Sequence, residues 1–184
     1  LLHKMSDQFW QKVDEVHVSL YPSHPMRVED LKVFQHNSKN HSSYLELRYQ
    51  DYFSEFFSDL GTSNDDLIKK IYLTCKAPRE GCCHTLYQGR YYKCPNAVFI
   101  PIVYQDRFDF SGSEDSIKIK EDILFVEELA AYLSSDQPLQ TCRYCLGSVG
   151  NRFIPKQAPR RPNSRKTTSE ELIDWKRLEK LTGK

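Results

Sequence analysis

Six cysteines restrict the fold of this 184-residue chain more than any other feature, because four of them are spaced so that they can meet. Cys75 and Cys94 are separated by 18 residues, with Gly89 between them in the pattern C-x13-G-x4-C. Cys142 and Cys145 follow as a C-x2-C pair, whose spacing lets two thiolates converge on one ion or cluster from a tight turn. Two thiolates that bracket a hairpin and two from a later loop complete a four-sulfur shell. Such a shell suits either tetrahedral zinc or a [4Fe-4S] cluster.

The composition is typical of a globular protein, with 39% hydrophobic and 28% charged residues. Lys and Arg number 26 against 25 Asp and Glu, so the net charge of +1 gives no overall field that would recruit nucleic acid, anionic lipid or an acidic substrate. The longest apolar run, residues 97–104, is interrupted by Pro101 and is far shorter than the roughly 20 residues of a membrane-spanning helix. We therefore expect neither nucleic acid nor a membrane as a partner.

The cysteines also bear on the cellular compartment. The first residues show no basic segment leading into an apolar one and a cleavage site, so we expect a cytoplasmic protein whose thiols are kept reduced for metal binding or catalysis. Because the first residue is not Met, we expect a fragment that begins inside a longer protein. A fragment could have lost a signal peptide, and six cysteines then allow 15 disulfide pairings. A secreted, disulfide-stapled binding domain stays open as an alternative.

The first third of the chain alternates helical and strand-like patterns. Residues 7–16 carry apolar residues at helical spacing, and residues 16–21 alternate as a short strand that stops at Pro22 and bears Ser19 near its C-terminal end. A second helix is predicted at residues 28–34 and a second strand at 43–52. This alternation favours a parallel sheet with crossover helices, but two strands are too few to stand alone. Residues 1–64 are therefore predicted to be the end of a larger α/β domain.

Residues 65–150 are predicted to form a small second domain. A helix at 65–73 leads to Cys75, and a hairpin at 85–95 turns at Gln88-Gly89 and places Cys94 on its second strand. A helix at 123–133 is followed by a stop and then by a loop that presents Cys142 and Cys145.

Residues 151–184 are predicted to be a linker and a terminal helix. Residues 151–166 hold six basic residues, three prolines and no acidic residue, which favours an extended linker over a nucleic-acid contact. A Thr168-x-x-Glu171 capping box then begins a short amphipathic helix. Its apolar face, Leu172, Trp175 and Leu178, is expected to dock on the body of the protein.

These cysteine spacings resemble a known family. The GRYYKCP segment at residues 89–95, followed by a gap, a helix and a C-x2-C pair, resembles the auxiliary-cluster extension of radical SAM enzymes, called SPASM with two clusters and twitch with one. No cysteine follows Cys145, so the shorter pattern is similar to a twitch domain of the inosamine-dehydrogenase type. The resemblance implies one auxiliary [4Fe-4S] cluster with ligands Cys75, Cys94, Cys142 and Cys145.

The N-terminal part is also similar to this family. Residues 9–22 resemble the fourth helix-to-strand step of the partial (β/α)6 barrel, which implies an α/β fold: the C-terminal part of a partial TIM-like barrel followed by a small α+β twitch domain. By the same resemblance Ser19 contacts the amino acid moiety of S-adenosylmethionine. The C-x3-C-x2-C motif that holds the SAM-cleaving [4Fe-4S] cluster is absent from the sequence, so we expect the chain alone to be inactive.

Three residues between the implied ligands keep alternative interpretations. A cysteine in this interval is a ligand in two-cluster domains, so Cys82 or Cys83 could replace Cys75; the simpler interpretation is a spare thiol. His84 is either a hydrogen-bond donor that tunes the cluster potential or a surface residue. Lys76 and Arg79 are expected to neutralise an anionic cluster.

The resemblance implies an oxidoreductase. Four cysteine ligands leave no iron site open, so the auxiliary cluster is expected to accept or relay an electron rather than bind substrate. The implied partners are a sugar-like, peptide or other small-molecule substrate and an electron donor such as a flavodoxin or ferredoxin. The competing hypothesis is a non-catalytic interaction module with zinc bound by four cysteines.

Overall fold

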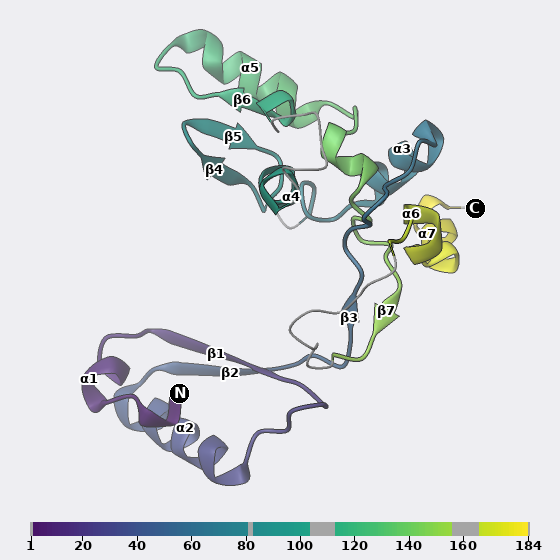
Figure 1. The fold of residues 1–184 in the computed structure, drawn as a ribbon. Helices are drawn as coiled ribbons and strands as arrows, with labels where there is room; N and C mark the ends of the chain where they lie inside the picture. The colour runs from purple at the N-terminus through teal and green to yellow at the C-terminus, as the bar shows by residue number, and fades with distance from the viewer. Residues whose placement is uncertain (1, 81–82, 104–112, 156–165, 184) are drawn as a thin grey trace. The chain divides into compact units, whose positions relative to one another are not determined.

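The computed structural model describes residues 2–80, 83–103, 113–155 and 166–183. The chain divides into two compact units (Figure 1). Unit 1 comprises Leu1–Phe53 and Phe153–Pro162, and unit 2 comprises Ser54–Arg152 and Asn163–Lys184. The strands β3 (Phe53–Ser54) and β7 (Arg152–Phe153) lie where the chain passes from one unit to the other. The mixture of helices and strands agrees with the predicted α/β class.

Unit 1 is built on a pair of parallel strands joined by a helix. The strands β1 (Glu15–Leu20) and β2 (Tyr44–Tyr49) pair in parallel, and α2 (Val28–His41) connects them (Figure 1). Parallel strands need such a crossover because the chain must return to the starting end of the first strand before the second strand begins, and a short hairpin joins only antiparallel strands. The short helices η1 (Leu2–Lys4) and α1 (Asp7–Trp10) precede β1.

The two faces of this strand pair differ in chemistry. Val16, Val18 and Leu45 pack into a core with the buried Trp10 and Phe34. Because side chains alternate along a strand, the intervening residues of β1 point to the opposite face. These are Glu15, His17 and Ser19, and all three are exposed.

Three boundaries in unit 1 differ from the prediction. The helix predicted over residues 7–16 ends at Trp10, since Val16 belongs to β1 and joins the core with the two-residue period of a strand. The second helix continues past residue 34 to His41 and ends at Ser42, whose φ of 57° breaks the helix. The second strand is shorter than predicted and covers only Tyr44–Tyr49.

A three-stranded antiparallel sheet forms one part of unit 2, in the order β4 (Thr85–Tyr87), β5 (Arg90–Tyr92), β6 (Ser116–Lys118). The predicted hairpin is confirmed at β4 and β5. Its two turn residues, Gln88 and Gly89, have φ values of 47° and 70°, as a two-residue type I′ turn requires. The sequence did not predict β6, because three residues are too few for a recognisable alternation.

Helices and short 3-10 turns make up the rest of the described part of unit 2. They are α3 (Asp65–Thr74), α4 (Asn96–Val103), η2 (Ser113–Asp115), α5 (Ile123–Ser134), η3 (Gln140–Arg143), α6 (Ser169–Leu172) and α7 (Trp175–Thr182). The helices predicted at 65–73 and 123–133 are confirmed as α3 and α5. The placement of Cys94 on a strand is wrong, because β5 ends at Tyr92 and α4 begins two residues after the cysteine.

The single terminal helix of the prediction is two helices. Its capping box is present, since the Glu171 carboxylate accepts from the Thr168 N–H at 2.9 Å. The chain leaves the helix at Ile173, which is buried in the core, and Asp174 caps the next helix. Of the predicted docking face, Leu172 and Leu178 pack on the core, whereas Trp175 remains 47% exposed.

The main core of unit 2 joins α3 to the segment that follows the C-x2-C pair. Its buried members are Leu67, Ile71, Leu146, Val149, Ile173 and Leu178. Residues 55–62 run alongside 143–151, with backbone hydrogen bonds such as Leu146 N–H to Phe56 O at 2.9 Å. An antiparallel bridge between Phe57 and Cys145 fixes the second cysteine of the pair directly.

Two further predictions from the sequence concern the basic linker and membrane-spanning helices. Residues 156–165, most of the predicted basic linker, lie outside the described residues. Among the helices that the structure describes, none is both long and apolar enough to cross a membrane.

We predict that Gly150→Ala destabilises the protein far more than Gly89→Ala. A Cβ on Gly150 would lie 1.8 Å from the backbone oxygen of Glu55, whereas a Cβ on Gly89 meets nothing within 4 Å and suffers only from its positive φ. The expected losses in the free energy of unfolding are at least about 3 kcal/mol and about 1–2 kcal/mol. Urea denaturation of both variants measures the difference, and equal losses would contradict the close approach of the two segments.

Candidate metal centre

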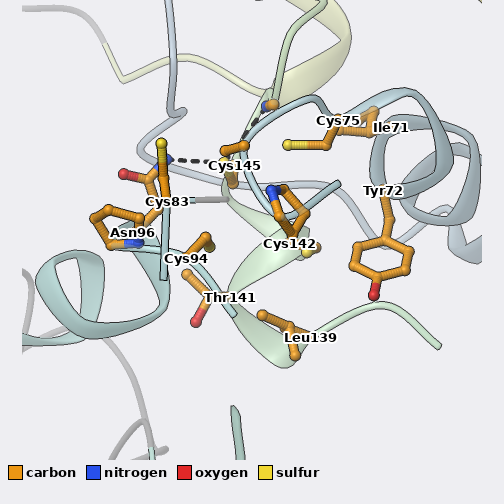
Figure 2. Close-up of a pocket in the computed structure, with 14 residues that line it drawn as sticks. Ile71, Tyr72, Cys75, Cys83, Cys94, Asn96, Leu139, Thr141, Cys142 and Cys145 are labelled. Carbon is orange, nitrogen blue, oxygen red and sulfur yellow. Dashed lines mark hydrogen bonds between the residues drawn. The ribbon is translucent and has the colours of Figure 1, made fainter. Parts of the chain in front are cut away.

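Four elements of unit 2 bring cysteines to one cavity of about 200 Å³. Figure 2 shows the five cysteines that line it, namely Cys75, Cys83, Cys94, Cys142 and Cys145. All four of the ligands implied by the sequence resemblance are therefore brought together, and Cys83 joins them. No disulfide links these five cysteines.

Each implied ligand is placed by a local backbone feature. Cys75 is the C-cap of α3, where its N–H donates to Tyr72 O at 3.1 Å. Cys94 lies in the connection between β5 and α4. Cys142 lies in η3, and Cys145 closes that turn by donating its N–H to Thr141 O at 3.2 Å.

A buried carboxylate holds the turn that carries Cys142. The Asp115 carboxylate accepts from the backbone N–H groups of Gln140 at 2.5 Å and Thr141 at 2.8 Å, and also from the Thr141 hydroxyl. Burial raises the pKa of Asp115, and these hydrogen bonds oppose the rise. The first residues of η3 are thus fixed by a side chain 25 positions earlier, a contact that sequence reasoning missed because no periodicity or spacing signals it.

The sulfur of Cys145 is the most deeply buried of the ligand atoms and receives two hydrogen bonds. The backbone N–H of Gly147 donates at 3.4 Å and the Asn96 side-chain amide at 3.3 Å, both drawn in Figure 2. Donors aimed at a buried sulfur favour the thiolate, which is the form that binds metals. Asn96 was also missed by sequence reasoning, although it stands only two residues after Cys94.

The same arrangement recurs at two other cysteines. The backbone N–H of Ala77 favours the thiolate of Cys75, and the backbone N–H groups of Asn96 and Ala97 favour that of Cys94. At all three cysteines, therefore, the backbone N–H of the residue two positions later in the chain is directed at the sulfur. A repeated donor of this kind suits sulfurs that carry negative charge rather than thiols packed as small hydrophobic groups.

Close packing leaves no room for a side chain beside Cys75. Gly147 has a φ of +53°, and a Cβ there would lie 3.2 Å from the Cβ and 3.3 Å from the Sγ of Cys75. The glycine thus combines two roles: it adopts a conformation that other residues avoid, and it lets the C-x2-C turn approach the end of α3.

Burial raises the pKa of all four implied ligands in the metal-free protein. The pKa of Cys94 rises to about 12, and that of Cys142 rises well above the usual value for a thiol. Desolvation is the largest cause at each cysteine, and neighbouring sulfurs add to it: Cys145 raises the pKa of Cys75, Cys94 and Cys142. Four thiolates at this cavity therefore require a positively charged group to compensate them.

The four implied ligands line the cavity of about 200 Å³ together with apolar side chains. Across the described parts of the chain, no three His, Cys, Asp or Glu side chains form a group that could hold a metal ion. A tetrahedral zinc site places its sulfurs about 2.3 Å from the ion, which leaves no cavity between them. The residue types fit both zinc and an iron-sulfur cluster.

Of the remaining candidate residues that the structure describes, only Cys83 lines the cavity. Cys83 lines the cavity but is exposed, and Cys82 is outside the described residues. His84 is not among the described lining residues; its ring lies 5.4 Å from that of Tyr91, and its Nδ1 has no hydrogen-bond partner in the described part of the chain. Ser19 belongs to unit 1.

The two cations expected to neutralise a cluster are both paired with acids. Lys76 forms an ion pair with Glu80 at 2.9 Å, and Arg79 forms one with Asp136 at 2.7 Å. Each charge is therefore partly offset, although Arg79 still acts to lower the pKa of Cys75 against the larger effect of burial.

No protein-family model matches the chain, and no curated protein matches it.

We predict that a thiol reagent distinguishes the cysteines of the reduced, metal-free protein. Cys83 is exposed, whereas the four implied ligands are less exposed and have raised pKa values, so they carry little of the reactive thiolate at neutral pH. Iodoacetamide at pH 7, followed by peptide mass spectrometry, is expected to label Cys83 at least tenfold faster than Cys94 or Cys142, a rough margin set by the thiolate fraction. Equal rates would contradict the burial of the four sulfurs.

Proposed function

We propose that this chain is the C-terminal part of a radical SAM oxidoreductase and that unit 2 holds one auxiliary [4Fe-4S] cluster, as in a twitch domain. Cys75, Cys94, Cys142 and Cys145 are its ligands. The observation that carries the proposal is the convergence of these four thiols on one cavity, with N–H donors directed at their sulfurs.

The cavity supports a cluster over the competing zinc site. A shell of four thiolates satisfies either occupant, so ligand type does not separate them. The space of about 200 Å³ favours a larger occupant than one ion. The zinc hypothesis, a non-catalytic interaction module, remains the outcome to test against.

The donor set supports electron transfer as the role of the cluster. When bound, a [4Fe-4S] cluster with four cysteine ligands supplies a one-electron acceptor or relay. The chain's own residues would position it and exclude water: Ile71, Leu139 and Pro95 line the same cavity with apolar groups. The substrate proposed is a sugar-like, peptide or other small molecule, and the proposed electron donor is a flavodoxin or ferredoxin.

Unit 1 supports a partial (β/α)6 barrel as its parent fold. Its β1–α2–β2 unit has the parallel pairing from which such barrels are built. Ser19 lies near the C-terminal end of β1 on the face opposite the core, which suits the proposed contact with S-adenosylmethionine. The SAM-cleaving cluster would bind elsewhere in a longer protein, because its C-x3-C-x2-C motif is absent from this sequence.

Anaerobic reconstitution with iron and sulfide tests the proposal. We expect about four iron and four sulfide per chain, lost when Cys142 and Cys145 are both changed to Ser. The matched control is Cys83→Ser, which alters a cysteine of the same cavity that is exposed and is expected to keep the cluster.

The other outcomes separate the alternatives. One zinc without sulfide would replace the cluster with a structural zinc site. Loss of iron in the Cys83→Ser variant, with retention in a Cys75→Ser variant, would replace Cys75 by Cys83 in the ligand set. Production of 5′-deoxyadenosine at enzymatic rates by this chain alone would overturn the placement of the SAM-cleaving cluster outside it.

A further inference from the structure

We infer that Lys93 acts on the site through its charge. Its buried ammonium group raises the reduction potential of the anionic centre that the cysteine cavity holds. This inference rests on the proposed function for the identity of that centre. Lys93 directly precedes Cys94 and is only 2% exposed, which is unusual for a lysine.

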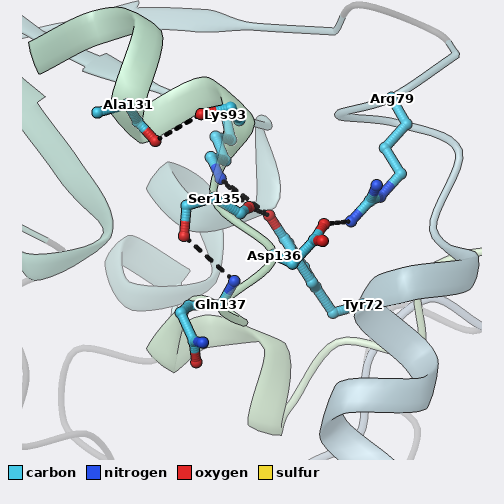
Figure 3. A network of polar contacts seen from close by, with 8 residues as sticks. Tyr72, Arg79, Lys93, Ala131, Ser135, Asp136 and Gln137 are labelled. Carbon is cyan, nitrogen blue, oxygen red and sulfur yellow. Dashed lines mark hydrogen bonds and ion pairs between the residues drawn. The ribbon is translucent and has the colours of Figure 1, made fainter.

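Burial lowers the pKa of Lys93, whereas the groups in contact with its Nζ favour the charged form. Its Nζ donates to the Tyr72 hydroxyl at 2.9 Å and to the backbone oxygen of Ser135 at 2.8 Å (Figure 3). It also lies 5.0 Å from the centroid of the Tyr132 ring and 5.6 Å from that of Tyr72. Two hydrogen-bond acceptors and the faces of two aromatic rings are all electron-rich, so each stabilises a positive charge.

The ammonium group of Lys93 donates a hydrogen bond to a residue that lines the cavity. Tyr72, which accepts its hydrogen bond, is one of the residues that line the cavity. The backbone N–H of Lys93 donates to the Tyr132 hydroxyl at 3.0 Å, and that hydroxyl donates to the backbone oxygen of Asp115 at 2.5 Å. The charge itself is held between Tyr72 of α3, the helix that leads to Cys75, and the C-terminal end of α5 at Ser135.

The charge of Lys93 is not offset in the way that its neighbours' charges are. Arg79 and Lys76 are each paired with a carboxylate, whereas in the described part of the chain no carboxylate forms an ion pair with Lys93. Asp136, the acid labelled in Figure 3, forms an ion pair with Arg79 at 2.7 Å. A buried charge is screened little by salt, and it stabilises the more negative, reduced state of a nearby centre.

The test compares reduction potentials of the reconstituted protein, measured by electron paramagnetic resonance during redox titration. Lys93→Met and Lys93→Gln are expected to shift the potential to more negative values, and Lys93→Arg is expected to stay near the wild type. The matched control is Lys76→Met, which removes the lysine next to Cys75 that is exposed and paired. Its shift is expected to be smaller and to vanish at high salt.

Each outcome decides the inference. A shift for both neutral variants that persists at high salt supports it. Potentials that match the wild type in Lys93→Met and Lys93→Gln, at equal cluster content, overturn it. A shift of the same size in Lys93→Arg overturns it as well, because packing and not charge would then be the cause.

A second probe separates this inference from the proposed function. If the wild type takes up no iron-sulfur cluster, the proposed function fails, and Co²⁺ is titrated alone, with the sulfur-to-cobalt absorption as the signal. Four thiolates around Co²⁺ retain negative charge, so Lys93→Met is then expected to weaken Co²⁺ binding at least about tenfold relative to Lys76→Met. Equal affinities overturn the inference, and a wild type that binds neither cluster nor Co²⁺ overturns both proposals.

Discussion

The loss of hydration by four sulfurs at one cavity is the constraint on which this site depends. Burial raises the pKa of each thiol, and neighbouring sulfurs raise the pKa of Cys75, Cys94 and Cys142 further. The protein opposes this with N–H groups directed at the sulfurs, such as those of Gly147 and Asn96 at Cys145. Hydrogen bonds alone do not reverse the shift, so the thiolate state needs a cationic occupant. A metal centre satisfies that need and explains why apolar residues share the walls with five cysteines.

The polar groups behind the cavity connect its ligands to one another. Asp115 fixes the start of η3, and its backbone oxygen accepts from Tyr132, which in turn accepts from the backbone of Lys93. A change at β6 or α5 would therefore reach two ligand-bearing segments at once. On the other side, the pairing of residues 55–62 with 143–151 ties Cys145 to the core of unit 2. The site is thus supported from both sides by contacts between residues distant in sequence.

Local signals in the sequence predicted several elements of unit 2. The Gln88-Gly89 turn, the acidic start of α3 and the Thr168–Glu171 capping box all act within a few residues, and each is present in the structure. The end of α1 was missed because Val16 is equally compatible with a helical and an alternating pattern until its packing is known. The roles of Lys93 and Asp115 could not be predicted, since their partners lie 21 to 42 and 25 to 26 residues away.

A crystal structure of the anaerobically reconstituted protein, with anomalous data at the iron edge, tests most directly whether the proposed iron-sulfur cluster binds at this cavity. We expect one compact iron peak within bonding distance of the sulfurs of Cys75, Cys94, Cys142 and Cys145. An iron peak bound to Cys83 in place of one of these, or a single zinc peak with no iron, would contradict the proposal.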